Sequence, residues 1–176
     1  DEELMAIGDH SSATKAYMDP VLANDQAKYR EFIFDLVGRG LLRYTTRPRE
    51  RVGVFFVKKK SGALRLIIDA RRTNRLFREP PAVNLATPEV FSKIELNSSD
   101  NLYTACFDVS DCFHRMRVPP EFGEYFALPP LTAGQAKVCL VDGRVLNATD
   151  LVYPCVTTLP MGCSWSLYFA QTAVSH

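Results

Sequence analysis

Two carboxylates and an aromatic ring that lie close together in the chain are the strongest candidates for chemistry. Asp108 follows a hydrophobic run, residues 102–107, whose pattern predicts a strand, and Asp111 and Phe113 come shortly after it. An unpaired carboxylate is costly to bury, so it is usually paired, solvated or bound to metal. Mg²⁺ is commonly held by one or two carboxylates together with substrate phosphates. Asp108 is therefore a candidate metal ligand, and the alternative is that it caps the turn or helix that follows.

A second candidate site lies in a short basic segment upstream. Residues 39–78 hold 13 basic and 2 acidic residues, whereas the segments before and after are both net negative. The pattern predicts strands over 52–58 and 64–69 joined by a turn, a β-hairpin with lysines near its tip. Lys59 and Arg65 can hold a triphosphate there, because arginine bonds phosphate bidentately and lysine supplies a mobile charge. A lysine-protected edge hairpin is the alternative.

Two further stretches flank these candidates. Asp69 is followed by Arg71 and Arg72, and pairing within this group as a structural brace is one interpretation. Downstream, Leu-Pro-Met-Gly at 159–162 precedes a helix predicted over 164–174. Gly162 allows the backbone to approach a base or sugar closely, and an ordinary loop-to-helix turn is the alternative.

In this order and spacing, residues 54–74, 106–118 and 159–171 resemble the fingers and palm of a reverse transcriptase of the retroelement type. The resemblance implies an α+β fold, a fingers β-hairpin plus a partial palm (an antiparallel sheet with packed helices) of a right-hand polymerase, incomplete. It implies that residues 24–176 are the fingers/palm domain, truncated before an aromatic-x-Asp-Asp turn. Residues 1–23 are then an acidic linker or the tail of a preceding region.

The resemblance also implies roles for individual residues near the predicted metal site. Asp108 matches the first metal-binding aspartate of the family, with the carbonyl of Val109 as a further ligand. Asp111 matches a position whose backbone N–H faces the triphosphate. Lys59 and Arg65 match the residues that hold the phosphates.

Other matches concern the sugar, the base and the template. Phe113 matches the bulky residue that excludes a ribose 2′-hydroxyl, and plain core packing is the alternative. Met161 and Gly162 match the nucleotide pocket. The family usually has Gln where Met161 stands, and Met161 removes that polar contact. Arg71 and Asn74 match residues near the template strand.

The expected function is therefore that of a fragment of an RNA-directed DNA polymerase. The complete enzyme adds dNTPs to a primer 3′-hydroxyl and uses two Mg²⁺ or Mn²⁺ ions. Its expected partners are an RNA or DNA template with primer, dNTP and further polyprotein domains. Two further metal-binding carboxylates belong to the aromatic-x-Asp-Asp turn, so we expect this chain alone to be inactive. An RNA-templated RNA polymerase, against which Phe113 speaks, and a non-catalytic nucleic-acid-binding remnant are the alternatives.

Composition excludes several other classes. No long uncharged apolar run predicts a transmembrane helix. The five cysteines are odd in number and form no Cys-x-x-Cys pair, which argues against a zinc site or a disulfide framework. A reducing compartment, nucleus or cytoplasm, is expected.

Local patterns predict the remaining elements. A helix capped by Asn24 or Asp25 runs to about Val37, with an apolar stripe that we assign to the core. A short helix begins at Pro88 after the cap Thr87, and Val90, Phe91 and Ile94 are expected to pack inward. A turn or short helix follows Asp108, a strand covers 121–128, and an inserted hairpin turns at Asp142-Gly143. Whether that hairpin contacts a partner is open.

Overall fold

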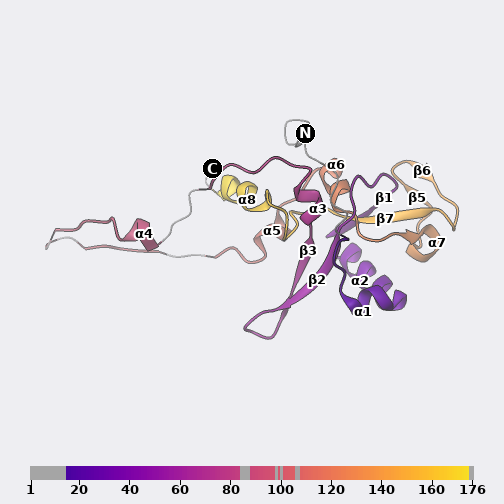
Figure 1. Cartoon of the computed structure of the whole chain (residues 1–176), viewed down its shortest axis with the longest axis horizontal. Coiled ribbons are helices and arrows are strands. Elements are labelled where there is room, and N and C mark those ends of the chain that lie inside the picture. Colours follow the sequence, from indigo (N-terminus) through magenta and orange to yellow (C-terminus); the bar gives the residue numbers. More distant parts are fainter. Residues whose placement is uncertain (1–14, 84–87, 98, 100, 106–107, 175–176) are drawn as a thin grey trace.

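A β-hairpin and a longer excursion project from the main body of the protein (Figure 1). The computed structural model describes residues 15–83, 88–97, 99, 101–105 and 108–174. Its helices are α1 Pro20–Asn24, α2 Gln26–Gly38, α3 Arg71–Asn74, α4 Pro88–Phe91, α5 Cys112–Arg115, α6 Pro120–Gly123, the 3₁₀ helix η2 Glu124–Phe126, α7 Ala133–Ala136 and α8 Ser166–Val174. Its strands are β1 Leu42–Thr45, β2 Gly53–Lys58, β3 Leu64–Asp69, β4 Leu131–Thr132, β5 Leu140–Val141, β6 Arg144–Val145 and β7 Leu151–Val156.

Helix α2 forms where its sequence predicts. The Asp25 carboxylate accepts from the N–H groups of Ala27 and Lys28, which satisfies two of the donors that a helix start leaves open. The predicted stripe faces the core: Tyr29, Ile33 and Leu36 are buried, and Phe32 and Val37 pack against the same cluster. The helix ends at Gly38, and Gly40 turns the chain with a φ of 69°.

A three-stranded antiparallel sheet, in the order β1-β7-β4, is the centre of the body. Strand β7 pairs with β1 over four residues and with β4 over two. Neither β1 nor β7 was predicted from the sequence. Pro154 argues against a strand at β7, since proline cannot donate to a ladder. The proline is tolerated because β4 pairs only with Leu151 and Val152, and the Pro154 carbonyl accepts from Leu128 N–H instead.

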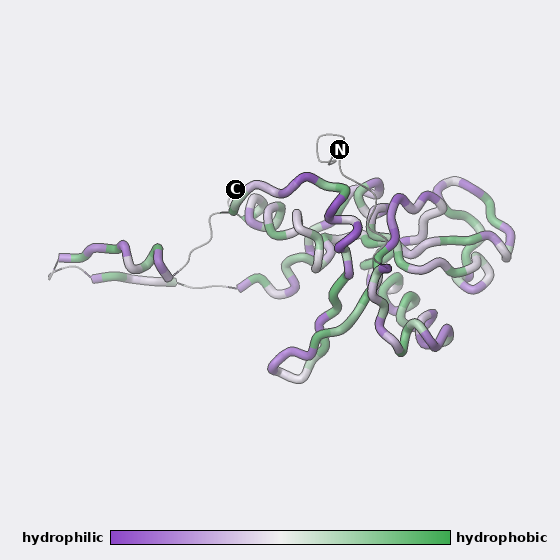
Figure 2. The backbone as a smooth tube through the Cα atoms, in the orientation of Figure 1, coloured by the Kyte–Doolittle hydropathy of each residue, from purple (hydrophilic) through white to green (hydrophobic). Residues whose placement is uncertain are grey.

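The β2–β3 hairpin was predicted correctly and projects from the body (Figure 1). Its register runs from Gly53 opposite Asp69 to Lys58 opposite Leu64. Side chains change from buried at the base to exposed at the tip, and hydropathy along the tube changes in the same direction (Figure 2). Gly62 closes the turn with a φ of 86°, a conformation that favours glycine.

The N-terminal part of the described chain packs on the base of this hairpin. Asp19 N–H donates to Val54 O at 2.7 Å, and Tyr17 N–H donates to the Asp69 carboxylate at 2.6 Å. A Cβ at position 53 would collide with the backbone of Tyr17, so Gly53 permits this close packing. Residues 15–24 thereby belong to the same packed unit as the hairpin.

An aromatic cluster joins α6, η2 and α8 to the segment around Phe77. Phe77 lies against Phe122, Tyr125 and Phe126, and Phe169 of α8 also contacts Phe122. This cluster explains one error of the sequence analysis, the strand predicted over 121–128. Those residues form α6 and η2, since Pro120 starts a helical turn and the turns bring the aromatic rings onto one side.

The inserted hairpin forms as predicted, with strands of 2 residues each. Val141 and Arg144 pair across the Asp142-Gly143 turn, and both turn residues have positive φ. Helix α7 precedes the hairpin, with Thr132 and Gln135 forming a capping box. The predicted helix 164–174 is present as α8, two residues shorter.

Two predictions around the excursion are wrong. Residues 102–105 form no strand, and Leu102 and Tyr103 are exposed, because the described part of the chain offers them no neighbouring strand with which to pair. Helix α4 forms, yet Val90, Phe91 and Ile94 are exposed, since this segment extends away from the body (Figure 1). Thr87, the predicted cap of α4, and Cys106 and Phe107 lie outside the described residues. None of the helices that the structure describes is long and apolar enough to cross a membrane.

Candidate active site

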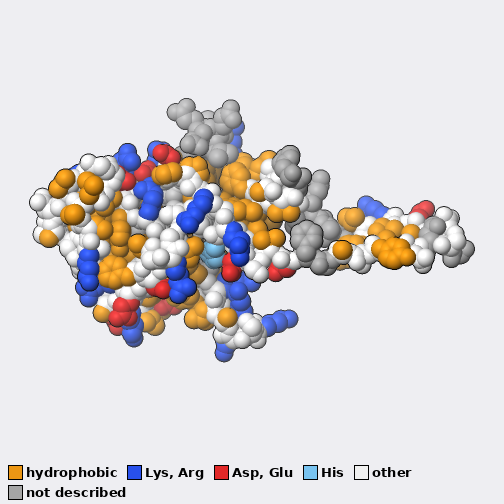
Figure 3. All heavy atoms as spheres, turned by 180° about the vertical axis from the view of Figure 1, so that it is seen from behind, with side chains coloured by type: hydrophobic (Ala, Val, Ile, Leu, Met, Phe, Trp, Pro, Cys, Tyr) orange, Lys and Arg blue, Asp and Glu red, His pale blue; other side chains and the backbone are white. Residues whose placement is uncertain are grey.

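One cleft of about 570 Å³ lies between the β2–β3 hairpin, α2, α5 and the segment before α8. Such a volume lies in the range of ligand-binding clefts. Seven of the predicted site residues line it, from three segments that are far apart in the sequence: Lys59, Arg65, Asp108, Val109, Asp111, Phe113 and Met161. Figure 3 shows basic and acidic side chains close together on this face of the molecule.

The hairpin contributes the basic wall. Lys59 follows β2 at the start of the turn, where its N–H donates to Ala63 O at 2.8 Å. Arg65 lies on β3 opposite Val57 and is exposed. Neither side chain makes a hydrogen bond or ion pair with any other residue that the structure describes. Both charges are therefore available to a ligand in the cleft.

The segment around α5 contributes the acidic wall. Asp108 and Val109 are exposed, and Phe113 is half-buried. The N-cap residue of α5 is Asp111, not Asp108, and Asp111 has a φ of 53° with no side-chain cap hydrogen bond. Capping therefore does not account for either carboxylate within the described part of the chain, and both are placed to meet a cation or a polar ligand.

The third wall is the Met161 loop, defined as residues 160–165 between β7 and α8. Met161 lines the cleft, and its carbonyl accepts from Ile68 N–H at 2.8 Å. Gly162 has a φ of 121°, and a Cβ there would collide with the Ile68 carbonyl. Gly162 therefore permits close contact with the end of β3, so its glycine is explained by backbone contact within the protein.

Arg71 and Asn74, which were predicted to lie near the template, are outside the cleft. Their side chains form hydrogen bonds with other residues of the protein. Arg71 forms a bidentate pair with Asp69, at 2.8 Å for both nitrogens. This arginine and the Tyr17 N–H lower the pKa of the Asp69 carboxyl to about 2, against the effect of burial. The predicted brace is thus present. Asn74 holds the Met161 loop, since its amide donates to Gly162 O and accepts from Ser164 N–H, both at 3.0 Å.

The basic segment 39–78 divides into paired and unpaired charges. Six of its arginines form ion pairs with acidic residues, namely Arg39, Arg43, Arg47, Arg49, Arg71 and Arg72. The other basic residues of the segment, which include the lysines of the hairpin tip, form no ion pair within the described ranges. About half of the segment's charge therefore serves the fold.

The fourth wall of the cleft was not predicted from the sequence. The end of α2 contributes Asp35, Leu36 and Arg39, and Arg39 Nε donates to Asp35 at 2.8 Å. His114 also lines the cleft. The i, i+4 spacing of Asp35 and Arg39 predicts their ion pair, but no local pattern places that pair beside the other walls.

The cleft has the donor types that a divalent cation prefers. Asp108 and Val109 line the cleft, and a carboxylate and a backbone carbonyl are hard oxygen ligands that could hold such a cation. Lys59 and Arg65 line the same space and could hold a phosphate beside it. In the described part of the chain, no three His, Cys, Asp or Glu side chains gather as a metal-binding group. The donors fit Mg²⁺ or Mn²⁺ bound together with a phosphate ligand.

Comparison with known proteins agrees with this geometry. The family model described as "Reverse transcriptase (RNA-dependent DNA polymerase)" matches residues 57–176. Among solved structures, a foamy viral protease-reverse transcriptase in complex with dsDNA is 17% identical with a TM-score of 0.60, covering 98% of this chain and 31% of that one. A dRH form of the foamy viral protein with dsDNA is 18% identical with a TM-score of 0.59, covering 98% and 26%.

These structural matches show a shared fold, and the chain spans about a quarter to a third of the length of the viral proteins. No curated protein matches the sequence. The family model covers more than half of the chain, including the hairpin tip, the α5 segment and the Met161 loop. The protein belongs to the reverse transcriptase family, and its α+β fold is a partial reverse transcriptase polymerase fold.

Proposed function

We propose that this chain is the nucleotide-binding part of an RNA-directed DNA polymerase that adds dNTPs to a primer 3′-hydroxyl by two-metal phosphoryl transfer. One observation carries the proposal: residues that match phosphate, metal and sugar contacts, from three distant segments, line a single cleft. Membership of the reverse transcriptase family supports it. A template with its primer, and further domains of the whole protein, are the proposed partners.

In this proposal the two basic residues bind the triphosphate. Arg65 offers a planar fork to two phosphate oxygens, and Lys59 at the turn adds a mobile point charge. Positioning and charge stabilisation supply most of the catalysis in phosphoryl transfer, because charge develops on the transferred oxygens. The hairpin residues therefore orient the nucleotide and offset its charge.

Asp108 and the Val109 carbonyl hold the divalent cations in the proposal. When bound, a pair of such ions supplies charge stabilisation to the attacking and leaving oxygens. Phe113 packs against the sugar and excludes a 2′-hydroxyl, and Met161 forms the wall beside the base and sugar. Asp111 contributes its backbone N–H to the phosphates.

Binding of a dNTP tests the proposal directly. We expect the chain to bind dATP in the presence of Mg²⁺ and to bind it at least tenfold more weakly without the metal or with Asp108→Asn, because the cation links carboxylate and phosphate. Isothermal titration calorimetry measures both. The matched control is Asp150→Asn, which lies beside β7 away from the cleft. Equal affinity of the chain and of Asp108→Asn for Mg²⁺-dATP would refute the proposed metal site.

Polymerisation tests the division between this chain and the whole protein. We propose that the 176 residues alone bind nucleotide without extending a primer, whereas the whole protein extends it. A primer-extension assay with both proteins decides this. Extension by the 176-residue chain, abolished by Asp108→Asn, would overturn the proposed inactivity.

The sugar gate gives a separate test. Phe113→Ala in the whole protein removes the ring, so ribonucleotide incorporation should rise at least tenfold relative to deoxynucleotide incorporation, in the range that steric discrimination supplies. Phe113→Tyr keeps the ring and is the matched control. Unchanged discrimination in Phe113→Ala would assign Phe113 to core packing and reopen the RNA polymerase alternative.

A further inference from the structure

The backbone position of Asn74 is held by helix α3 and by its neighbours, independently of the contacts that its side chain makes. Asn74 is the last residue of α3, and its N–H donates to Ala70 O at 2.7 Å. The preceding residue, Thr73, is fully buried and donates its hydroxyl to Tyr125 O at 2.9 Å. Helix α3 follows β3 directly after Ala70, so Asn74 is joined by a short link to the hairpin strand that carries Arg65.

The Asn74 side-chain amide hydrogen-bonds to the Met161 loop through both its nitrogen and its oxygen. Nδ2 donates to Gly162 O at 3.0 Å, and Oδ1 accepts from Ser164 N–H at 3.0 Å. These bonds join residues 88 and 90 positions apart in the sequence. A side-chain amide holds a donor and an acceptor at a fixed spacing, so this one side chain can make both bonds.

A second attachment lies next to the first. Ile68 N–H donates to Met161 O at 2.8 Å, and the missing Cβ of Gly162 lets the loop lie on the Ile68 carbonyl. Because Ile68 and Arg65 are on the same strand, the loop and the basic wall of the cleft are tied to one element. Met161 and Arg65 therefore keep a fixed separation across the cleft.

We propose that Asn74 is a positioning residue that sets the Met161 wall of the nucleotide site, and that it acts through the loop rather than by binding a nucleic acid with its amide. This inference rests on the proposed function. It assigns Asn74 to the base and sugar side of the site, whereas Lys59 and Arg65 hold the phosphates. Loss of Asn74 should then weaken binding of a nucleotide but not of a bare triphosphate.

The experiment compares two ligands and two variants. Asn74→Ala removes both bonds, whereas Asn74→Asp keeps the acceptor for Ser164 and places a carboxylate oxygen against Gly162 O. We expect Asn74→Ala to bind Mg²⁺-dATP about tenfold more weakly and Mg²⁺-tripolyphosphate within about twofold of the unmodified chain. Asn74→Asp should show the same selective loss. Asn24→Ala, an exposed asparagine at the end of α1, is the matched control and should change neither affinity.

Hydrogen exchange supplies a readout that does not depend on nucleotide. Amide exchange in residues 161–164 should become at least tenfold faster in both Asn74 variants, and remain unchanged in Asn24→Ala. Equal losses for dATP and tripolyphosphate, or unchanged exchange in the loop, would overturn the inference. If the unmodified chain binds no dATP, the proposed function fails. In that case the exchange data alone decide whether Asn74 holds the loop.

Discussion

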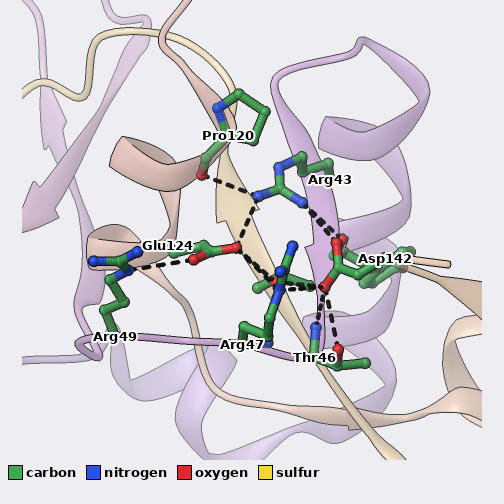
Figure 4. A network of polar contacts seen from close by, with 9 residues as sticks. Arg43, Thr46, Arg47, Arg49, Pro120, Glu124 and Asp142 are labelled. Atoms are coloured by element: carbon green, nitrogen blue, oxygen red, sulfur yellow. Dashed lines mark hydrogen bonds and ion pairs between the residues drawn. The ribbon is translucent and has the colours of Figure 1, made fainter. Parts of the chain in front are cut away.

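Two groups of charged side chains in the molecule differ in how their charges are paired. Around the sheet, Glu124 and Asp142 are surrounded by arginines and threonines (Figure 4). In the cleft, Lys59, Arg65 and Asp108 have no ion-pair partner within the described residues. In the first group the carboxylates are paired within the protein, whereas the charges of the second group stay available to a ligand.

The paired group shows what burial of charge demands. Only 5% of the Glu124 side chain and 9% of the Asp142 side chain are exposed. Glu124 lies 3.5 Å from Arg43 and 3.4 Å from Arg49, and Arg43 also lies 3.3 Å from Asp142. Burial works against ionisation of Asp142, but bonds from Thr46 and Thr45 lower its pKa. A buried charge persists when partners of this number offset its desolvation.

The network also explains why the inserted hairpin lies where it does. Asp142 at the β5–β6 turn accepts from Thr45 Oγ1 and Thr46 N–H, both at 2.8 Å, across 97 and 96 residues of sequence. The turn is thereby attached to the end of β1. Its positive φ and its partners give Asp142 a structural role at this turn.

The largest predicted effect is in the paired group. Glu124→Ala leaves the partly buried Arg43 without one of its two carboxylates, so we expect a loss of about 3 kcal/mol in the free energy of unfolding. Urea denaturation measures it. Glu121→Ala, an exposed glutamate in α6, is the control and should change stability by less than about 0.5 kcal/mol. Similar losses in the two variants would remove the basis of the comparison.

The unpaired group should respond in the opposite way. We expect the double variant Lys59→Ala, Arg65→Ala to lose about 100-fold in affinity for both Mg²⁺-dATP and Mg²⁺-tripolyphosphate, which corresponds to about 2.7 kcal/mol. Its free energy of unfolding should stay within about 0.5 kcal/mol, since exposed side chains without partners contribute little to folding. Calorimetry and urea denaturation give the two quantities.

The neighbouring lysine provides the control for that variant. Lys60 lies at the same hairpin tip but does not line the cleft. Lys60→Ala should lower the affinity for tripolyphosphate by no more than about threefold, through the general field alone. Equal effects of Lys59 and Lys60 would mean that the tip acts as a diffuse charge and not as a site.

Asp69 carries a charge that stabilises the fold, and it lies at the end of the strand that holds Arg65. Arg71 and Tyr17 N–H hold the pKa of Asp69 at about 2, below the ordinary aspartate value of 3.8. A depressed pKa stabilises the fold fully above the unfolded value, and the contribution is lost as pH falls toward about 2. Asp69→Asn should therefore cost about 2 kcal/mol at pH 6 and progressively less below pH 4.

Unfolding of both proteins between pH 6 and pH 2.5 measures that difference. Asp35→Asn, in the exposed pair with Arg39, is the control and should show less than about 0.5 kcal/mol at any pH. A difference between Asp69→Asn and the unmodified chain that stays constant with pH would place the effect in packing and not in ionisation.

Local signals predicted those parts of the fold that depend on local sequence. The stripe and cap of α2, the turn after Lys59 and the Asp142-Gly143 turn all formed where expected. Tertiary packing decided the failures. Residues 121–128 are rich in aromatic side chains, as strands often are, but the aromatic cluster around Phe77 selects two helical turns. Strand β7 was missed because Pro154 argues against a strand and only its neighbours allow one.

The candidate site was predictable to the extent that its chemistry is carried by distinctive residues. Lys59 and Arg65 belong to one of the stretches whose order resembles the family and Asp108 to another, and the structure places all three residues in one cleft. The contribution of α2 was not predictable, since Asp35 and Arg39 form an ordinary helix pair. The role of Asn74 was also hidden, because a hydrogen bond to Ser164 across 90 residues leaves no local pattern.

The smallest predicted effect is that of a substitution at Gly62, in the hairpin turn that begins at Lys59. Gly62 has a φ of 86°, and a Cβ added there would meet nothing within 4 Å, so the cost of a side chain comes from backbone conformation alone. Gly62→Ala should lower the free energy of unfolding by about 1 kcal/mol. Because Gly62 N–H donates to Lys59 O at 2.9 Å, a changed turn also moves Lys59.

Gly38→Ala separates these causes. Gly38 also has open space around it but lies in α2 with an ordinary helical backbone, so alanine there should stabilise the protein by up to about 1 kcal/mol. Opposite signs for the two substitutions in urea denaturation identify backbone conformation as the cause. We further expect Gly62→Ala, but not Gly38→Ala, to weaken tripolyphosphate binding about threefold. If Gly62→Ala lowers stability and leaves that affinity intact, the hairpin tip adapts to the phosphates, and the cleft depends on which charges it holds more than on a fixed turn.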